Sequence, residues 1–338
     1  MTREESNIIR SLRLPLMIMV VFIHSFLIDR DGMIETIWIE HFFSQCLPAV
    51  AVPLFMTISG FLFFTKCKNG NYSFFSHQLK KRVKTLVIPY VLWNAIVIIF
   101  FFCLHRFVPS LINSEFENVS SFSFPQLLNC FWRGSGGFPI AYQFWFIRDL
   151  IIISLFTPFI YYFAKRGTWT LIVYLIFYYS FSISYLEISF YYFVGAFCSL
   201  NRIDFVKFSR KFQTYAIPIA LMMLSAMAFG YGSEFVRKTY ILSGGITILS
   251  LQFLYNTNKI TSILYKYSES SFFLFSVHGI IALLLCKLLT KIIRYDYQLI
   301  WIPMYFLNII SIILICIGLY NLMKKYTPKI LSILTGNR

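Results

Sequence analysis

The fold is decided by the stretch SLRLPLMIMVVFIHSFLI at residues 11–28, in which Arg13 and His24 are the only ionisable side chains. The stretch is hydrophobic on every side and lacks the polar face of a helix at a protein surface. Its length comes close to the about 20 residues that an α-helix needs to cross a bilayer. The stretch therefore predicts a transmembrane helix.

Similar apolar runs recur along the whole chain. They lie at residues 47–66, 84–104, 143–164, 168–184, 187–200, 212–231, 239–255, 271–290 and 299–323. The composition agrees, because 58% of the residues are hydrophobic and only 13% are charged, against roughly 25% charged residues in soluble domains. We therefore predict an all-α fold, a polytopic integral membrane helical bundle with about ten transmembrane helices. The run 187–200 is short for a span, so nine or eleven spans are alternatives.

The connections between the runs carry a bias in lysine and arginine. With the N-terminus inside, 21 of these residues lie in inside segments and 7 in outside segments. Such a bias orients membrane chains, with the positive side in the cytoplasm. We therefore predict cytoplasmic N- and C-termini and a single membrane domain, residues 1–338, without an appended soluble domain. No small-residue cleavage site follows the first run, which favours a retained span over a signal peptide.

The net charge of +16 does not predict a nucleic-acid partner. A nucleic-acid-binding module concentrates its basic residues on one face, whereas here they lie in short connections between apolar runs. The seven cysteines are scattered, odd in number and form no C-x-x-C pair. The sequence therefore predicts neither a metal site nor a disulfide framework. The partner that the composition predicts is the lipid bilayer.

The longest outside segment comprises residues 105–142 and contains Pro109, Pro125 and several glycines. Connections longer than about 12–15 residues are commonly functional. We expect this segment to form a small lid or a re-entrant structure over the bundle.

Arg13 and His24 are candidate functional residues because ionisable groups inside spans are costly. They are eleven residues apart, which places them about 20° apart around a helix and about 16 Å apart along it. One helix face then carries a cation near the cytoplasm and an imidazole deeper in the membrane. This suits an anionic cofactor at the inner surface whose reactive end reaches a general base. The alternative makes Arg13 a topological anchor and His24 a hydrogen-bonded residue between helices.

Three further ionisable residues lie inside predicted spans, namely Arg148, Asp149 and His278. Neighbours on a helix point about 100° apart, so we do not expect Arg148 and Asp149 to form a simple ion pair facing one partner. They are candidates for positioning substrate hydroxyls, with Trp145 offering an aromatic face to a sugar. The alternatives are a structural polar junction for this pair and interhelical hydrogen bonding for His278.

Several motifs, in order along the chain, resemble those of the membrane-bound acyltransferase 3 family. Arg13, ten residues and His24 resemble its first-span signature. The other matching segments are VPLFMTISGF (52–61), KKRVKTLVIPYVLW (80–93), WFIRDL (145–150), FVG (193–195) and SVH (276–278). The chain departs from the family pattern at Pro15 and at Phe275, where tyrosine is frequent. Ser59 and Gly60, within the second segment, favour close helix packing over nucleophilic catalysis, because no acidic partner for a serine triad lies near them.

The resemblance implies a multi-pass enzyme of the bacterial inner membrane. It implies transfer of an acetyl or other short acyl group from cytoplasmic acetyl-CoA, or another acyl-CoA, to a sugar hydroxyl of a cell-surface or exported polysaccharide. The acceptor is then a glycan or a lipid-linked sugar. His24 would activate the hydroxyl, and Arg13 would contact the phosphate-bearing donor.

A basic cluster, Lys80, Lys81, Arg82 and Lys84, is predicted at the same inner surface and could hold CoA phosphates. Its alternative role is contact with anionic lipids combined with topology. The alternative function for the chain is a transporter or flippase for a polysaccharide or its precursor, without acyl transfer. Many transporters contain repeated halves, and the absence of an internal repeat favours the enzyme.

Overall fold

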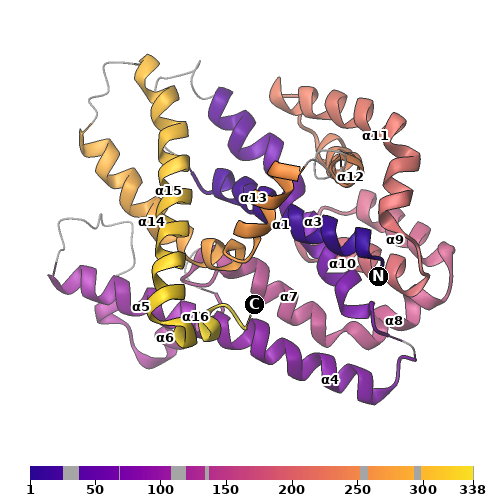
Figure 1. The fold of residues 1–338 in the computed structure, drawn as a ribbon, viewed down its shortest axis with the longest axis horizontal. Helices are drawn as coiled ribbons and strands as arrows, with labels where there is room; N and C mark the ends of the chain where they lie inside the picture. The colour runs from indigo at the N-terminus through magenta and orange to yellow at the C-terminus, as the bar shows by residue number, and fades with distance from the viewer. Residues whose placement is uncertain are drawn as a thin grey trace.

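The structure is a computed structural model that describes residues 1–25, 38–67, 69–107, 119–133, 137–251, 258–292 and 298–337. These residues form helices joined by short connections, and no strand occurs among them. Figure 1 shows the helices packed against one another around a centre that contains α1 and α3. The predicted all-α class is confirmed.

The first part of the chain forms a long first helix, an apolar second helix, two helices joined through a π-helical segment, and a short helix. These are α1 (Arg3–Ile23), α3 (Ala51–Phe64), α4 (Tyr72–Arg82), α5 (Ile88–Phe107) and α6 (Phe124–Asn129). Two π-helical segments, η1 (His41–Cys46) and η3 (Val83–Val87), and three 3₁₀ segments, η2 (Leu47–Val50), η5 (Val119–Ser121) and η6 (Tyr142–Phe144), lie between or before them.

The rest of the chain is almost continuously helical. Its helices are α7 (Trp145–Leu155), α8 (Thr157–Lys165), α9 (Thr168–Ser180), α10 (Ser184–Leu200), α11 (Phe205–Ala228), α12 (Glu234–Ser250), α13 (Asn258–Ser268), α14 (Ser271–Ile292), α15 (Gln298–Tyr326) and α16 (Pro328–Leu334). Side-chain caps mark where some of them begin. Asp204 accepts hydrogen bonds from two backbone N–H groups of α11, and Ser233 accepts one from α12, which satisfies donors that a helix start leaves free.

The count of spans differs from the expectation. Five helical stretches of the described chain are long and apolar enough to cross a membrane, at Glu4–Ile23, Trp38–Phe64, Tyr72–Phe107, Ser271–Leu289 and Ile300–Tyr326. A sixth results if α7 and α8, which meet at an angle of 65°, form one broken span. The count of ten is not confirmed, because several predicted spans correspond to short helices: α9 has 13 residues, and α10 and α12 have 17 each.

The closest helix packing joins α3 to α10 through two glycines. A Cβ atom on Gly60 would lie 2.1 Å from the carbonyl oxygen of Tyr192, and one on Gly195 would lie 1.8 Å from that of Thr57. Only residues without a side chain allow backbones to approach so closely. The expectation that Ser59-Gly60 permits close helix packing is confirmed.

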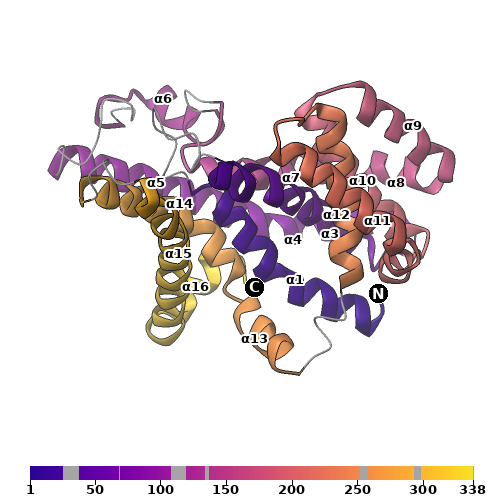
Figure 2. The same cartoon turned by 90° about the horizontal axis from the view of Figure 1, so that it is seen from above.

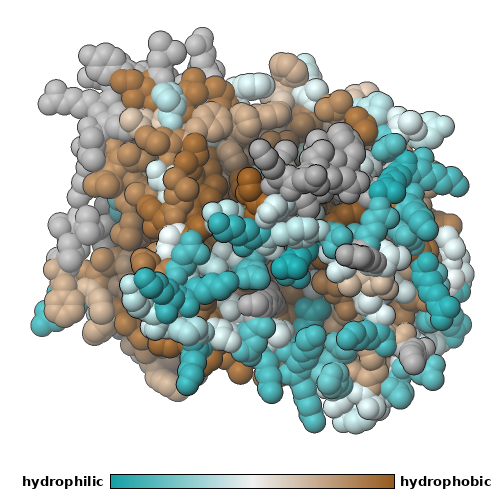
Figure 3. Space-filling model, in the orientation of Figure 1, coloured by the Kyte–Doolittle hydropathy of each residue, from teal (hydrophilic) through white to brown (hydrophobic). Residues whose placement is uncertain are grey.

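Both chain ends lie on the same face of the molecule. Figures 1 and 2 place the N-terminus, the C-terminus and α13 together on the side that faces the viewer in Figure 1. Figure 3 shows hydrophilic side chains gathered on this face around the two ends, while hydrophobic side chains dominate one flank. This distribution agrees with a prediction that puts both termini on one side of a membrane.

The predicted lid segment is described at residues 119–133 and 137–142, which contact the helices, while residues 108–118 and 134–136 lie outside the described residues. The backbone N–H of Ile140 donates to the carbonyl of Cys130 at 2.8 Å, and the Tyr90 hydroxyl donates to the carbonyl of Phe131. Figure 2 shows α6 on the opposite side of the molecule from the two chain ends. The segment therefore closes over α5 at one side of the bundle.

Candidate active site

His24 lies directly after the last residue of α1, where its backbone N–H bonds to the carbonyl of Val21 at 3.2 Å. Its half-buried ring contacts two others. The ring centroids of His24 and His278 are 5.3 Å apart, and the ring of Tyr142 lies edge-on to His24 at 4.9 Å. Three segments far apart in sequence, α1, η6 and α14, therefore meet at His24.

His278 is fully buried in α14, and its two ring nitrogens have different surroundings. Nδ1 lies 2.7 Å from the carbonyl oxygen of Phe275 and 3.1 Å from that of Leu274. Carbonyl oxygens accept only, so Nδ1 carries the proton and Nε2 keeps a lone pair. Nε2 has no hydrogen-bond partner within the described chain. The site thus holds a buried, unpartnered acceptor beside His24.

The segment carrying Tyr142 is anchored to α14. The side-chain amide of Gln143 donates to the carbonyl of Ser276 at 2.9 Å, and both residues are buried. Because Gln143 directly follows Tyr142, this bond fixes the Tyr142 ring against His24 and ties it to the helix that carries His278.

Arg148 and Asp149, both buried near the start of α7, form an ion pair with Nε and Oδ1 3.0 Å apart. The prediction that they would not pair is wrong. The 100° rule describes where the Cβ atoms of neighbours point, whereas the long arginine side chain can bend back to its neighbour's carboxylate. Nη1 of Arg148 also donates to the carbonyls of Trp132 and Gly137, at 2.9 and 3.2 Å. Arg148 therefore locks the lid segment onto α7.

The candidate residues Trp145, Arg148 and Asp149 line one cavity of about 700 Å³. Its other walls come from α3, α10 and α12 and include Glu187, Tyr191, Glu234 and Arg237. Nη2 of Arg237 lies 2.8 Å from Glu187 and 2.7 Å from Glu234. We call this space the charged cavity. Its lining combines paired charges, hydroxyl groups and the aromatic ring of Trp145.

Lys238, next to Arg237, does not line this cavity but contacts Glu187, which does. Its ammonium group is buried and donates to the carbonyls of Tyr178 and Phe181 at 2.8 and 2.9 Å. It also lies 3.4 Å from a carboxylate oxygen of Glu187. A buried charge persists only when it is paired or hydrogen-bonded, and here the bonds join α12 to α9 and α10.

The predicted basic cluster divides into two parts. Arg82 points to α3, where it donates to the hydroxyl of Ser59 at 3.2 Å and lies 5.4 Å from the ring of Phe63. Lys80, Lys81 and Lys84 are exposed. Arg82 thus has a packing role in addition to any binding role.

Arg13 is exposed on α1 and forms no hydrogen bond or ion pair with any other described residue. The helix continues without interruption from Arg13 past Pro15 to Ile23. Arg13 therefore lies within α1 and His24 directly after its last residue, and their common helix face stays a prediction.

A comparison with known families identifies the family of the chain. The family model described as "Acyltransferase domain", that of acyltransferase 3, matches residues 7–321. The chain belongs to the acyltransferase 3 family. This acyltransferase is therefore an enzyme, and its apolar helices make it a multi-pass membrane protein.

A curated relative supports the assignment across the whole length. The acyltransferase is similar to the succinoglycan biosynthesis protein ExoH of Rhizobium meliloti (strain 1021), with 22% identity over 361 aligned positions. The alignment covers 98% of this chain and 92% of the relative. No solved structure matches the acyltransferase.

Sequence reasoning missed part of the charged cavity in this acyltransferase. Glu187, Glu234, Arg237 and Lys238 were not among the candidates, although each is charged and lies at the edge of an apolar run. Glu187 is the first residue of the run 187–200, and Arg237 and Lys238 directly precede the run 239–255. The sequence signal that could have identified these residues is the opposite charge at the starts of two apolar runs.

Other expectations for the acyltransferase remain predictions. The donor, the binding roles of Arg13, Lys80, Lys81, Arg82 and Lys84, and the catalytic role of His24 rest on chemistry that a ligand-free chain does not display. Within the described ranges, no group of three or more histidine, cysteine or acidic side chains could hold a metal ion. The expectation of a metal-free enzyme also stays a prediction.

Proposed function

We propose that this acyltransferase transfers an acetyl or other short acyl group from a cytoplasmic acyl-CoA to a sugar hydroxyl of an exported or cell-surface polysaccharide or its lipid-linked precursor. The observation that carries the proposal is the contact between the rings of His24 and His278. His24 directly follows α1, the helix that also bears the unpartnered Arg13. The relative named for succinoglycan biosynthesis supports a glycan as the acceptor.

In the proposed reaction, His24 removes the proton from the attacking hydroxyl. The hydroxyl oxygen forms a bond to the thioester carbonyl carbon, and the bond from that carbon to sulfur breaks. The proton held by His24 then passes to the departing thiolate, which leaves as free CoA. Histidine suits this exchange because it can accept and return a proton near neutral pH.

His278 would act through His24 as a positioning residue. Its Nδ1–H is fixed by two backbone carbonyls, so its free nitrogen can only accept a hydrogen bond. An N–H of His24 directed to that nitrogen leaves the other nitrogen of His24 as the base. This arrangement selects the reactive tautomer, as a hydrogen-bonding partner does for other catalytic histidines.

Arg13 and the basic cluster would bind the phosphates of the donor. Arg13 has no polar partner in the described part of the chain, and Lys80, Lys81 and Lys84 are exposed. Arg82 would add its charge from the fixed position beside Ser59. Phosphate groups favour such clusters because they accept several charge-assisted hydrogen bonds.

The charged cavity would bind the acceptor sugar. Trp145 offers a ring, and Arg148 has donors on Nη2 that its described hydrogen bonds do not use. One residue of the cavity lies near the histidine pair in sequence. Tyr142, which touches His24, precedes Trp145 by three residues.

The proposed orientation puts both termini and the basic cluster in the cytoplasm of a bacterium, with the protein in the inner membrane. The excess of lysine and arginine in inside segments supports it, as does the common face of the two chain ends (Figures 1 and 2).

The test measures release of free thiol from acetyl-CoA and succinyl-CoA by the purified full-length protein in lipid nanodiscs, with isolated glycan as acceptor. We expect release that depends on the glycan and is lost in His24→Ala. Full activity in a well-folded His24→Ala protein would contradict the mechanism. Movement of glycan across the membrane without consumption of acyl-CoA would instead favour the transporter alternative.

A further inference from the structure

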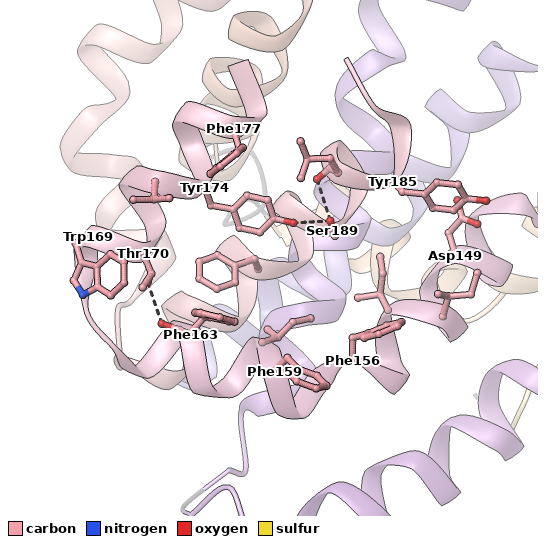
Figure 4. Close-up of a pocket in the computed structure, with 16 residues that line it drawn as sticks. Asp149, Phe156, Phe159, Phe163, Trp169, Thr170, Tyr174, Phe177, Tyr185 and Ser189 are labelled. Carbon is pink, nitrogen blue, oxygen red and sulfur yellow. Dashed lines mark hydrogen bonds between the residues drawn. The ribbon is translucent and has the colours of Figure 1, made fainter. Parts of the chain in front are cut away.

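A second cavity, of about 730 Å³, lies among α7, α8, α9 and α10 and is lined almost entirely by hydrophobic side chains. Figure 4 shows Phe156, Phe159 and Phe163 along one wall, with Trp169 at one end and Tyr185 beside Asp149 at the other. We call this space the aromatic groove. It forms where the chain breaks at Phe156 and α8 turns away from α7 by 65°.

Three polar side chains of the groove, Thr170, Tyr174 and Ser189, are already hydrogen-bonded inside the protein. The Thr170 hydroxyl donates to the carbonyl of Phe163 at 3.0 Å, and the hydroxyls of Tyr174 and Ser189 are 2.5 Å apart (Figure 4). These groups therefore offer little to a polar ligand. A hydrocarbon chain loses no hydrogen bonds by entering such a groove and gains contact with aromatic surface.

The aromatic groove adjoins the charged cavity. Asp149 and Tyr185 line both spaces. On one side of them lie hydrophobic rings, and on the other lie Arg148, Arg237 and the carboxylates that pair with them. A ligand that fills both spaces must be apolar at one end and polar at the other.

We propose that the acceptor of this acyltransferase is a lipid-linked sugar, whose hydrocarbon chain lies in the aromatic groove while its sugar occupies the charged cavity. This inference rests on the proposed function and adds the form in which the acceptor binds. An ordinary bilayer lipid would also fit the apolar part. It would have no sugar to place beside Trp145 and Arg148, so the position of the groove next to the charged cavity favours the glycolipid.

Two neighbouring residues of α9 provide a matched pair of variants. Both side chains are exposed, to 41% for Val173 and 54% for Ile172, but only Val173 lines the groove. Val173→Trp would fill the groove with a bulky ring, and Ile172→Trp would add the same ring outside it. Neither residue belongs to the proposed catalytic or sugar-binding groups.

The first experiment uses lipid-linked glycan from producing cells and the same glycan after mild acid has removed its lipid. We expect the wild-type protein in nanodiscs to show a KM at least tenfold lower for the lipid-linked form. Val173→Trp should raise that KM at least tenfold without changing kcat or the use of the lipid-free form, and Ile172→Trp should change neither. Equal KM values for both forms in the wild type would overturn the inference.

The second experiment measures binding without turnover, which separates failure of the groove from failure of the proposed function. Dodecyl maltoside with a photoactivatable diazirine on its chain is compared with a phosphatidylcholine that carries the same group. We expect the glycolipid to label α8 and α9 several times more per mole, and Val173→Trp to abolish the difference. Equal labelling by both lipids would overturn the groove as a glycolipid site. Absence of thiol release with both glycans, together with selective labelling, would overturn the proposed reaction alone.

Discussion

His278 and Arg148 are both buried, but their polar atoms differ in hydrogen bonding. Arg148 bonds to a carboxylate and to two backbone carbonyls. His278 uses one nitrogen for backbone carbonyls and leaves the other without a partner among the described residues. An unsatisfied buried acceptor costs about 1–3 kcal/mol of folding free energy. The free nitrogen of His278 therefore destabilises the fold, whereas the hydrogen bonds of Arg148 stabilise it.

The difference in hydrogen bonding indicates different roles for the two regions. In the charged cavity, paired groups hold the lid segment, α7, α10 and α12 in place, which gives the cavity a fixed shape. At the histidine pair, a nitrogen of His278 that can accept a hydrogen bond is left available. The first region is therefore expected to determine stability and acceptor binding, and the second to determine the rate of transfer.

The largest effect is expected for His24→Ala. Removal of the proposed base should lower kcat by about 100–10,000-fold, while the half-buried position at the end of α1 should leave the fold intact. Thiol release and the apparent unfolding temperature in detergent provide the two measurements. His41→Ala, on η1, is a matched histidine control that should keep its activity.

Arg148→Ala should have the opposite profile. Removal of one partner from a buried pair leaves Asp149 uncompensated and should destabilise the protein by about 3–5 kcal/mol. The double variant Arg148→Ala/Asp149→Ala should recover part of that loss, because no unpaired carboxylate remains. Unfolding temperatures of the three proteins test this, and an undiminished stability of Arg148→Ala would remove the proposed distinction between the regions.

His278→Ala should lower kcat by about 10–100-fold, the equivalent of about 1.5–3 kcal/mol for a hydrogen bond to a charged group. KM for acyl-CoA should not change. If His278 acts only through His24, His24→Ala/His278→Ala should be no slower than His24→Ala, and the pH profile of kcat should shift in the single variant. A purely structural role would lower the protein yield and leave that profile in place.

The smallest effect is expected at an exposed ion pair. Glu269, between α13 and α14, lies 2.9 Å from Lys324 and about half of its side chain is exposed. The hydrogen bond from Lys324 lowers the pKa of this carboxyl, so the pair stabilises the fold above the ordinary carboxyl pKa and loses this effect as the pH falls through the lowered value. Glu269→Gln should cost less than about 1 kcal/mol after solvent screening. Stability curves at neutral and acidic pH provide the comparison with Arg148→Ala.

The features of the site that lie within one helix could be predicted from the sequence. The eleven-residue spacing of Arg13 and His24 requires only helix geometry, and the close packing at Gly60 follows from a small residue in an apolar run. The family was also recognisable, because its motifs occur in order along the chain.

The remaining features depend on how distant segments meet. His278 lies more than 250 residues after His24, and no periodicity brings these two together. The pairing of Glu187 with Arg237 requires that α10 and α12 start at the same level, and the Arg148–Asp149 bond depends on how one flexible side chain bends. The span count is not confirmed for a related reason, since described helices such as α9, with 13 residues, are shorter than a full span.

The glycine contact between α3 and α10 holds two walls of the charged cavity at a fixed separation. Met56 lies one turn before Gly60, Tyr191 lies one turn before Gly195, and both line the charged cavity. Two absent methyl groups thus determine how far apart opposite walls stand. We expect evolution within this architecture to change acceptor size most easily at these two positions, where an alanine would separate the helices and admit a larger sugar at a cost in stability.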